Sequence, residues 1–521
     1  MKSKSICLGA TALGLIIAST GTASAQSAEK PGSAYVQCDG QPNNVTGGET
    51  AARFIGAVTL LGIFAPPPEA ADASKRKFGA AGVAACSTLL AGDKQEGNPA
   101  RRVGLFLGRA IHQIEAKNYD AAIADVALAR QAANAAGLMS DLYYVRSRGR
   151  AFDLIESAAL LRMGKAAEAQ AASLRSAVSL EYSLLGLAGT PTYEDLIDKP
   201  SDSEERFNQW RARLAPTFAV ERANRLDMAG RFAESATIWD ALAESDAENS
   251  PELNSSVILA RSAVAHTLAG QADLAATQSK AAAANAAKRK ADGEPENDAS
   301  ELVELTDLYN ILETARTGDL KSARRLFSAR SQWVGASLGS VLEVNRRLRE
   351  GAAPDELIGG LSRDSDQLWT EHAETSRAAL LAKDSDNKAL FQLVPSTRTA
   401  AAYTAQSKPV WRTDKSKLII KTKADETKSK MELMFLPWVD PAVALDSYVL
   451  HAALIARSRG HQGFIFTPII GDKLLAASFR SGNRGEKGLP DVLFVDAKDA
   501  IAKLEPVIPS PETLKAKQAS R

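Results

Sequence analysis

The sequence is poor in the residues that most often carry chemistry. Its 521 residues include 3 Cys and 5 His, and aromatic residues make up only 6%. No two histidines lie three or four positions apart, which excludes a metal site of the H-E-x-x-H type. The phosphate-binding P-loop pattern and the G-x-G-x-x-G dinucleotide pattern are also missing. We therefore expect no metal, nucleotide or other cofactor.

The chain also lacks a surplus of charge and a long hydrophobic run in its mature part. It has 63 Lys and Arg against 62 Asp and Glu, a net charge of +1, which argues against nucleic acid as the main partner. The apolar run at residues 54–64 (FIGAVTLLGIF) is shorter than the ~20 residues that span a bilayer. It is followed at once by three prolines, which suits a buried helix. We expect no transmembrane segment in the mature chain.

The N-terminus has the pattern of a cleaved export signal. Lys2 and Lys4 precede an apolar run from Ile6 to Ala18, and Ala23-Ser24-Ala25 forms a small-x-small cleavage site. Residues 1–25 are therefore predicted to be a signal peptide removed after Ala25. The mature protein is predicted to be periplasmic or secreted.

Export would leave Cys38 and Cys86 in an oxidising compartment. Such a pair commonly forms a structural disulfide there, and we expect one between these residues. The alternative is a reactive thiol or a metal pair, but no histidine lies nearby in the sequence to complete a metal site.

Helical hairpins are predicted to fill residues 49–394, after a flexible lead-in at residues 26–48. Alanine, the best helix former, is abundant there, and helices are expected at Thr50–Phe64 and Ala70–Leu90. The following hairpins turn at Lys117-Asn118, Gly164-Lys165, Gly230, Gly270-Gln271 and Gly318-Asp319. Glycine suits these turns because it adopts positive φ without strain. The irregular spacing predicts a degenerate solenoid, with a single irregular helical bundle as the alternative.

The hairpin at residues 103–132 carries a family resemblance. Arg109-Ala110, then Tyr119-Asp120-Ala121-Ala122-Ile123-Ala124-Asp125 and Ala129, resemble the tetratricopeptide repeat. Ala110 replaces the usual glycine, Phe106 stands where tryptophan is frequent, and Asn134 stands where the repeat usually closes with proline. Ala110, Ala122 and Ala129 are expected where the two helices touch. The resemblance implies a helical-repeat (TPR-like) architecture.

Stacked helical repeats form extended concave surfaces that bind proteins or peptides. We expect Leu107, Ile111 and Ile114, which form one stripe at helical spacing, to line such a groove. The alternative is that this stripe belongs to the hydrophobic core.

The C-terminal part changes character. Residues 395–411 are predicted to be a linker, residues 412–507 a small α+β domain, and residues 508–521 a flexible tail. The predicted strands and helices are Lys417–Lys423, Met431–Leu436, Asp440–Arg459 (helix), Gly463–Pro468, Leu474–Arg480, Asp491–Val495 and Ala497–Leu504 (helix). The predicted fold class is therefore mainly α, a helical-hairpin (TPR-like) solenoid followed by a small α+β domain.

This C-terminal pattern is similar to a group of small exported bacterial domains of unknown function. The shared features are Tyr448, Gly460, Phe464, Val495-Asp496-Ala497, Ile501-Ala502 and Leu504. Those relatives often have arginine before the paired alanines, where this chain has His451 before Ala452-Ala453. The resemblance implies architecture rather than chemistry.

Local patterns that suggest catalysis have simpler explanations. Gly335-Ala336-Ser337-Leu338-Gly339 fits the G-x-S-x-G nucleophile elbow, but the elbow follows a buried strand and this stretch follows a helix. We expect a helix-to-helix turn. A His-Asp-Ser arrangement can be drawn from His451 or His461, Asp446, and Ser447 or Ser478, as in any serine-rich domain. His112 and His266 are expected to be packed or on the surface.

The basic segment Arg412–Lys430 is predicted to be a solvated edge hairpin. Contact with anionic lipid or a cell-wall polymer is the alternative reading of its excess of Lys and Arg.

The sequence thus predicts an exported scaffold that binds a protein or peptide partner in the bacterial cell envelope, and not an enzyme. One alternative is an envelope hydrolase with its site in the C-terminal domain or at Ser337. The other is a structural envelope component that oligomerises through the C-terminal sheet.

Overall fold

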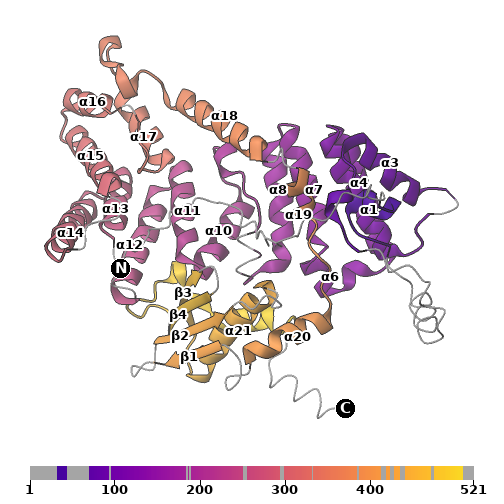
Figure 1. Cartoon of the computed structure of the whole chain (residues 1–521). Coiled ribbons are helices and arrows are strands. Elements are labelled where there is room, and N and C mark those ends of the chain that lie inside the picture. Colours follow the sequence, from indigo (N-terminus) through magenta and orange to yellow (C-terminus); the bar gives the residue numbers. More distant parts are fainter. Residues whose placement is uncertain are drawn as a thin grey trace. The chain divides into compact units, whose positions relative to one another are not determined.

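The computed structural model describes residues 32–43, 70–92, 95–183, 186, 189–249, 255–293, 299–330, 332–383, 387–411, 418–422, 428–434, 441–470 and 474–508. These residues form two compact units (Figure 1). The first unit comprises the described residues of Gly9–Ser179 and of Leu380–Thr399. The second comprises those of Leu180–Ala379 and of Ala400–Arg521. Helices dominate and an antiparallel sheet lies near the C-terminus, so the predicted fold class is confirmed.

Several predicted segments lie outside the described residues. They are the signal peptide at residues 1–25, the helix Thr50–Phe64 and nearly all of the tail at residues 508–521. No helix in the described part of the chain is long and apolar enough to cross a membrane.

The first unit is a set of packed helices. α4 begins after Asn98, whose side chain accepts hydrogen bonds from the backbone N–H groups of Ala100 and Arg101, with Pro99 in the first turn. α4 and α5 form the hairpin predicted around Lys117, which adopts a φ of 61°. The helices are α1 (Ala34–Asp39), α3 (Gly79–Leu90), α4 (Pro99–Glu115), α5 (Tyr119–Ala135), α6 (Leu142–Arg146), α7 (Arg150–Arg162), α8 (Ala166–Ala177) and α19 (Asn387–Gln392).

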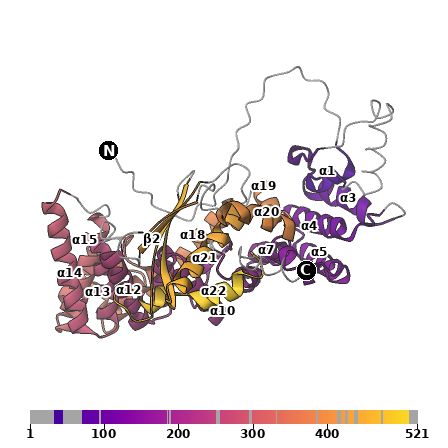
Figure 2. The ribbon, with the colours of Figure 1, turned by 90° about the horizontal axis from the view of Figure 1, so that it is seen from below.

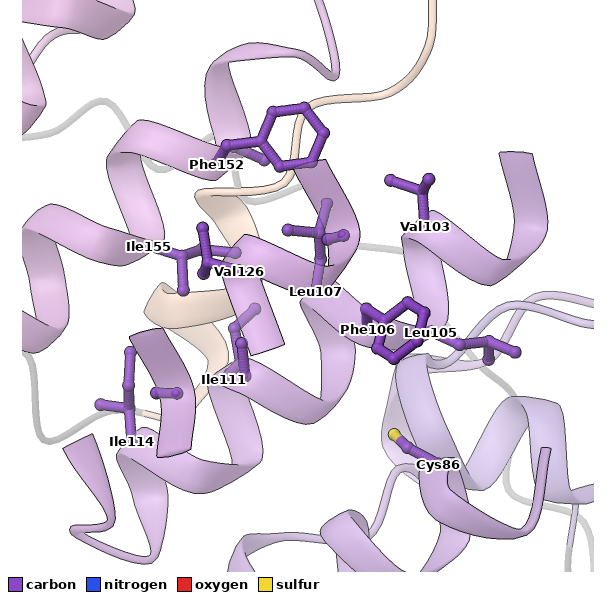
Figure 3. Packing of buried hydrophobic residues seen from close by; sticks show 14 of the residues in the cluster. Cys86, Val103, Leu105, Phe106, Leu107, Ile111, Ile114, Val126, Phe152 and Ile155 are labelled. Atoms are coloured by element: carbon purple, nitrogen blue, oxygen red, sulfur yellow. The ribbon is translucent and has the colours of Figure 1, made fainter. Parts of the chain in front are cut away.

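Small side chains let α4 and α5 approach closely. Ala110, Ala122 and Ala129 are completely buried in one core cluster, which confirms their predicted place between the helices. Figure 3 shows part of this cluster, in which Val126 and Ile155 lie close to Ile111. Leu390 of α19 belongs to the same core. The core of the first unit therefore includes a segment more than two hundred residues later in the sequence than most of its members.

The predicted flexible lead-in contains an ordered helix. α1 begins after Ser33, whose hydroxyl accepts a hydrogen bond from the backbone N–H of Val36, and the helix buries both Val36 and Cys38. Asp39 at its end forms an ion pair with the nearly buried Arg101. This short helix is held by a covalent and an ionic link to α3 and α4, which the local composition of residues 26–48 does not reveal.

Helices of the second unit pack mostly against their sequence neighbours, and α12 to α15 lie side by side (Figure 2). Gly230, Gly270 and Gly318 adopt φ values of 71°, 76° and 96° at the predicted turns. The helices are α10 (Asp202–Leu214), α11 (Pro216–Met228), α12 (Phe232–Asn249), α13 (Ser256–Leu268), α14 (Ala272–Ala291), α15 (Ala299–Arg316), α16 (Leu320–Ser328), α17 (Leu338–Arg349), α18 (Ser365–Lys383, ending at the boundary of the two units), α20 (Ala400–Trp411), α21 (Pro441–Ser458) and α22 (Ala497–Leu504).

The sheet of the second unit has five antiparallel strands in the order β1-β2-β4-β3-β5. Tyr448 of α21 packs edge-on against Phe466, with the ring centroids 5.6 Å apart, so α21 covers one face of the sheet. The stretch 400–411, part of the predicted linker, forms helix α20. The strands are β1 (Leu418–Thr422), β2 (Lys428–Met434), β3 (Gly463–Ile470), β4 (Leu474–Gly482) and β5 (Val495–Asp496).

The sheet and the helical hairpins of the second unit share one hydrophobic core. Leu226 and Trp239 from the hairpins belong to the same buried cluster as Ile465 of β3 and Phe494 before β5. The backbone N–H of Gly488 donates to Glu244 of α12 at 2.6 Å. The α+β part is therefore packed directly on α10 to α13 and belongs to the second unit.

Candidate functional sites

The predicted groove on α4 is wrong. Leu107 and Ile111 are 0% exposed and Ile114 is 3% exposed, and all belong to the core of the first unit. Figure 3 shows these side chains directed into the packing between helices. The reason is that α4 is contacted by α3, α5, α7 and α19, so that its apolar stripe has partners within the unit.

Cys38 and Cys86 form the expected disulfide, with a sulfur–sulfur distance of 2.07 Å and 4.8 Å between their Cα atoms. The bond joins α1 to α3, and both residues are fully buried. Next to it, His112 of α4 contacts the carbonyl oxygen of Cys38 through Nε2 at 2.6 Å and Glu115 through Nδ1 at 2.8 Å. His112 is completely buried and has a structural role, in agreement with its predicted packing.

The G-x-S-x-G stretch forms a helix-to-helix connection. Ser337 caps α17 by accepting a hydrogen bond from the backbone N–H of Ser340 at 3.1 Å. Its hydroxyl donates to Asp227 of α11 at 2.6 Å, and only 8% of Ser337 is exposed. In the described part of the chain its side-chain partners are Asp227 and Ser340, so no histidine activates it there.

The glycines of this stretch also have structural reasons. A Cβ atom on Gly339 would lie 2.3 Å from the backbone nitrogen of Met228, so only glycine lets α17 approach α11 this closely. A Cβ on Gly335 would lie 2.6 Å from Cγ of Glu301. The motif match therefore reflects close packing between helices.

A buried carboxylate holds the loop before Ser337. Glu304 of α15 accepts hydrogen bonds from the backbone N–H groups of Val334, Gly335 and Ala336 at 3.0, 2.7 and 2.8 Å. Arg261 of α13 donates to the carbonyl oxygen of Gly335. The backbone of this loop is thus bound on both its N–H and its C=O side, and we call residues 332–336 the Glu304 loop.

Val334 in the Glu304 loop is the most exposed of the large apolar side chains in the described part of the chain, at 83%. Its neighbour Trp333 stacks on Phe327 with the ring centroids 5.2 Å apart. Five of the nine other exposed large apolar side chains in the described chain lie between residues 274 and 358 of the second unit, namely Leu274, Val303, Leu320, Leu326 and Ile358.

The histidines of the C-terminal part have different partners from those drawn in the sequence. His461 contacts the hydroxyl of Ser481 through Nδ1 at 2.9 Å, and Arg459 donates to the same hydroxyl at 3.1 Å. Ser447 donates to the backbone of Val443 within α21. Sequence reasoning missed Ser481, because its pairing with His461 depends on the register of β3 and β4. Ser481 is fully buried, which suits a structural hydroxyl rather than a nucleophile.

A second charge cluster lies around the 3-10 helix Glu194–Leu196. Burial raises the pKa of Glu194 to about 7, against the attraction of Arg211, whose Nη1 lies 3.7 Å from Oε1 of Glu194. The neighbouring Glu204 raises this pKa further, and Glu204 accepts a 2.6 Å hydrogen bond from Arg225. No sequence pattern marks Glu194, because its burial results from the packing of α10 and α11.

One further prediction concerns the basic segment Arg412–Lys430. Its residues 412–417 and 423–427 lie outside the described residues, and the rest of it belongs to β1 and β2. Among the described residues, no group of three or more His, Cys, Asp or Glu is arranged to hold a metal ion.

Comparisons of the chain with protein-family models, with curated proteins and with solved structures found no match.

Proposed function

We propose that the protein is an exported helical-hairpin scaffold that binds a protein or peptide partner through the Glu304 loop and the hairpins around it. The observation that carries this proposal is Val334, an apolar side chain that is 83% exposed on a backbone held by a buried carboxylate. Contiguous exposed apolar patches mark interaction sites, and we take Val334 as the centre of such a patch.

The rigidity of the Glu304 loop supports binding. A loop that is already ordered loses little conformational freedom when a partner docks, so more of the contact energy appears as affinity. Three N–H groups bound to Glu304 and a carbonyl bound to Arg261 give this order without using the Val334 side chain. The disulfide between Cys38 and Cys86 supports the exported location, since such bonds persist in oxidising compartments.

Photo-crosslinking of the whole mature chain tests this proposal. A crosslinking amino acid is placed at Val334 and, as a control, at Val178, which is 65% exposed in the first unit. We expect one partner from envelope extract to be captured at position 334 in stoichiometric amount and not at position 178. Capture of the same proteins at both positions would count against the proposal.

Affinity for the captured partner is then measured with Val334→Glu. We expect binding at least tenfold weaker, about 1.4 kcal/mol, with an unchanged melting temperature because the side chain is exposed. Leu128→Glu, at a residue 41% exposed in the first unit, serves as the matched control and retains wild-type affinity. Unchanged affinity of Val334→Glu would refute the proposed surface.

One observation favours the oligomerisation alternative. Among the described strands β1 pairs only with β2, so it is an edge strand of the described sheet, and edge strands can pair with another chain. Sedimentation velocity of the mature chain separates the two functions: a dimer that a proline at Ile420 abolishes supports assembly through the sheet, and a monomer at tens of micromolar opposes it.

A further inference from the structure

An arginine of the first unit is partly buried and forms no ion pair within the described part of the chain. Arg148 lies in the turn between α6 and α7, and its guanidinium sits over Gly104 of α4. A Cβ atom at Gly104 would be 2.9 Å from Nη1 of Arg148 and 3.4 Å from Nη1 of Arg101. Because Gly104 has no side chain, the guanidinium groups of Arg148 and Arg101 and the carboxylate of Asp39 can lie close together above it.

Three buried hydrogen-bond donors, on Arg148, Tyr144 and Arg101, have no partner in the described part of the chain. Nε of Arg148 is buried without a hydrogen-bond partner, and within the described chain its guanidinium has neither a hydrogen bond nor an ion pair. The hydroxyl of Tyr144, a residue only 3% exposed, also has no partner there. Arg101 pairs with Asp39 through its Nη atoms, the Nη2 bond being 2.9 Å, but its buried Nε is unused.

Taking an ion out of water is costly, and full desolvation amounts to several kcal/mol. Partial burial accordingly lowers the pKa of Arg148. The effects of Tyr144 and Asp39 oppose this shift, and the charge of Arg101 makes the smallest contribution and adds to it. Such a group in a folded protein normally has an anion beside it.

The charges around Arg148 indicate the anion's valence. The charged groups that act on its guanidinium are Asp39 and Arg101, which pair with each other. Among the described residues this leaves the positive charge of Arg148 without a counter-ion, so a monoanion balances it and a dianion would face repulsion from Asp39.

We propose that Arg148, Arg101 and Tyr144 form a binding site for one carboxylate group. A planar guanidinium binds a carboxylate in a bidentate manner, and the Tyr144 hydroxyl and Nε of Arg101 supply two further donors for its remaining lone pairs. The carboxylate belongs to a small organic acid or to the C-terminus of a peptide. This site is in the first unit and does not depend on the Glu304 loop.

Calorimetric titration of the mature chain in a carboxylate-free buffer tests the site. The probes are acetate, acetyl-Ala-Ala as the free acid, the same peptide as its amide, and inorganic phosphate. We expect saturable binding of at least one of the two carboxylates, and at least tenfold weaker binding of the amide and of phosphate. Binding of acetate alone assigns small acids as the ligand, and binding of the free-acid peptide assigns C-termini. Binding of neither, or equal binding of amide and acid, would overturn the proposal.

Variants locate the binding. Arg148→Gln is expected to weaken carboxylate binding at least tenfold and, without ligand, to melt no lower than the wild type because an uncompensated charge is removed. Tyr144→Phe removes one donor and keeps the shape, so we expect a several-fold loss of affinity. Arg175→Gln, at an arginine half exposed on α8, is the control and binds as the wild type does. Wild-type affinity in both Arg148→Gln and Tyr144→Phe would refute this location.

Discussion

The hydroxyl of Ser337 donates a 2.6 Å hydrogen bond to Oδ2 of Asp227, 110 residues earlier in the chain. Ser340 donates to the same oxygen at 3.1 Å. Burial raises the pKa of Asp227, and these hydroxyls act against that rise. Ser337, which matches the nucleophile-elbow pattern, is thus a hydrogen-bond donor to a buried carboxylate, and this bond links α17 to α11.

Replacing Gly339 by alanine should destabilise the second unit. The new Cβ would lie 2.3 Å from the nitrogen of Met228 and 2.4 Å from the carbonyl carbon of Asp227, and backbone cannot move aside cheaply. We expect a loss of about 3 kcal/mol, at the upper end for overpacking. Tryptophan fluorescence during urea unfolding measures it. Gly335→Ala is the matched variant and should cost less, because its new Cβ would lie 2.6 Å from the side-chain Cγ of Glu301 and no closer than 3.1 Å to the Glu301 backbone.

Gly82→Ala should destabilise the first unit. Its Cβ would lie 2.3 to 2.5 Å from ring atoms of His112, and the buried imidazole cannot shift without losing its contacts with Glu115 and Cys38. We expect the free energy of unfolding to fall by about 2 kcal/mol. Far-ultraviolet circular dichroism during urea unfolding measures this change. Gly97→Ala, with no atom within 4 Å of its Cβ, is the control and should change stability by less than about 0.5 kcal/mol. Equal effects of the two changes would contradict this packing.

Removing the disulfide should affect one unit only. In the chain-entropy model, closing a loop with a sequence separation of 48 contributes about 4 kcal/mol. The double variant Cys38→Ala, Cys86→Ala should lose roughly this amount in the circular dichroism transition of the first unit. All tryptophans lie in the sequence of the second unit, so the fluorescence transition should stay in place. A shift of both transitions by the same amount would show that the units unfold together.

Glu194 should make the second unit less stable as the pH rises. Native Glu194 has a pKa of about 7, whereas the ordinary value is 4.5, so the native state binds more protons between these pH values. Stability therefore falls from pH 4.5 to 7, by about 3 kcal/mol in total. Glu194→Gln should remove this fall and be the more stable protein at pH 8. Glu168→Gln, at an exposed residue of the first unit, is the control for urea unfolding followed by fluorescence.

His451 should make the second unit more stable as the pH rises. Burial lowers the pKa of His451 to about 4 from 6.5, so the unfolded state binds more protons between these values and stability rises with pH across them, by about 3 kcal/mol. His451→Gln should remove this rise. Between pH 4.5 and 6.5 the two effects compensate in the wild type. The profile of His451→Gln should slope downward with pH and that of Glu194→Gln upward, and parallel profiles would refute both assignments.

The positions of the hairpins could be predicted because their signals are local. Gly164, Gly230, Gly270 and Gly318 all adopt positive φ at predicted turns, and the strands and helix α21 follow local patterns of hydrophobicity. Which element packs against each apolar helix face could not be predicted from such local patterns. Leu107, Ile111 and Ile114 form the same stripe whether they line a groove or face α5 and α7, and only the tertiary contacts decide between these cases.

The charged clusters were missed for a related reason. Arg148 is one of many arginines in the sequence, and what distinguishes it is a glycine 44 positions earlier and a tyrosine hydroxyl without a partner. The unusual pKa of Glu194 likewise arises from burial by helices that follow it in the chain. Neither property leaves a pattern in the residues next to it.

The chain leaves the first unit at Ser179 and returns to it at Leu380, where Leu390 joins the core formed by α4, α5 and α7. During synthesis the N-terminus emerges first, yet the core of the first unit stays incomplete until residue 390 has been made. For that whole interval the nascent chain exposes part of this core to chaperones and proteases. The survival of the first unit therefore depends on how the rate of synthesis compares with degradation of the unfinished core.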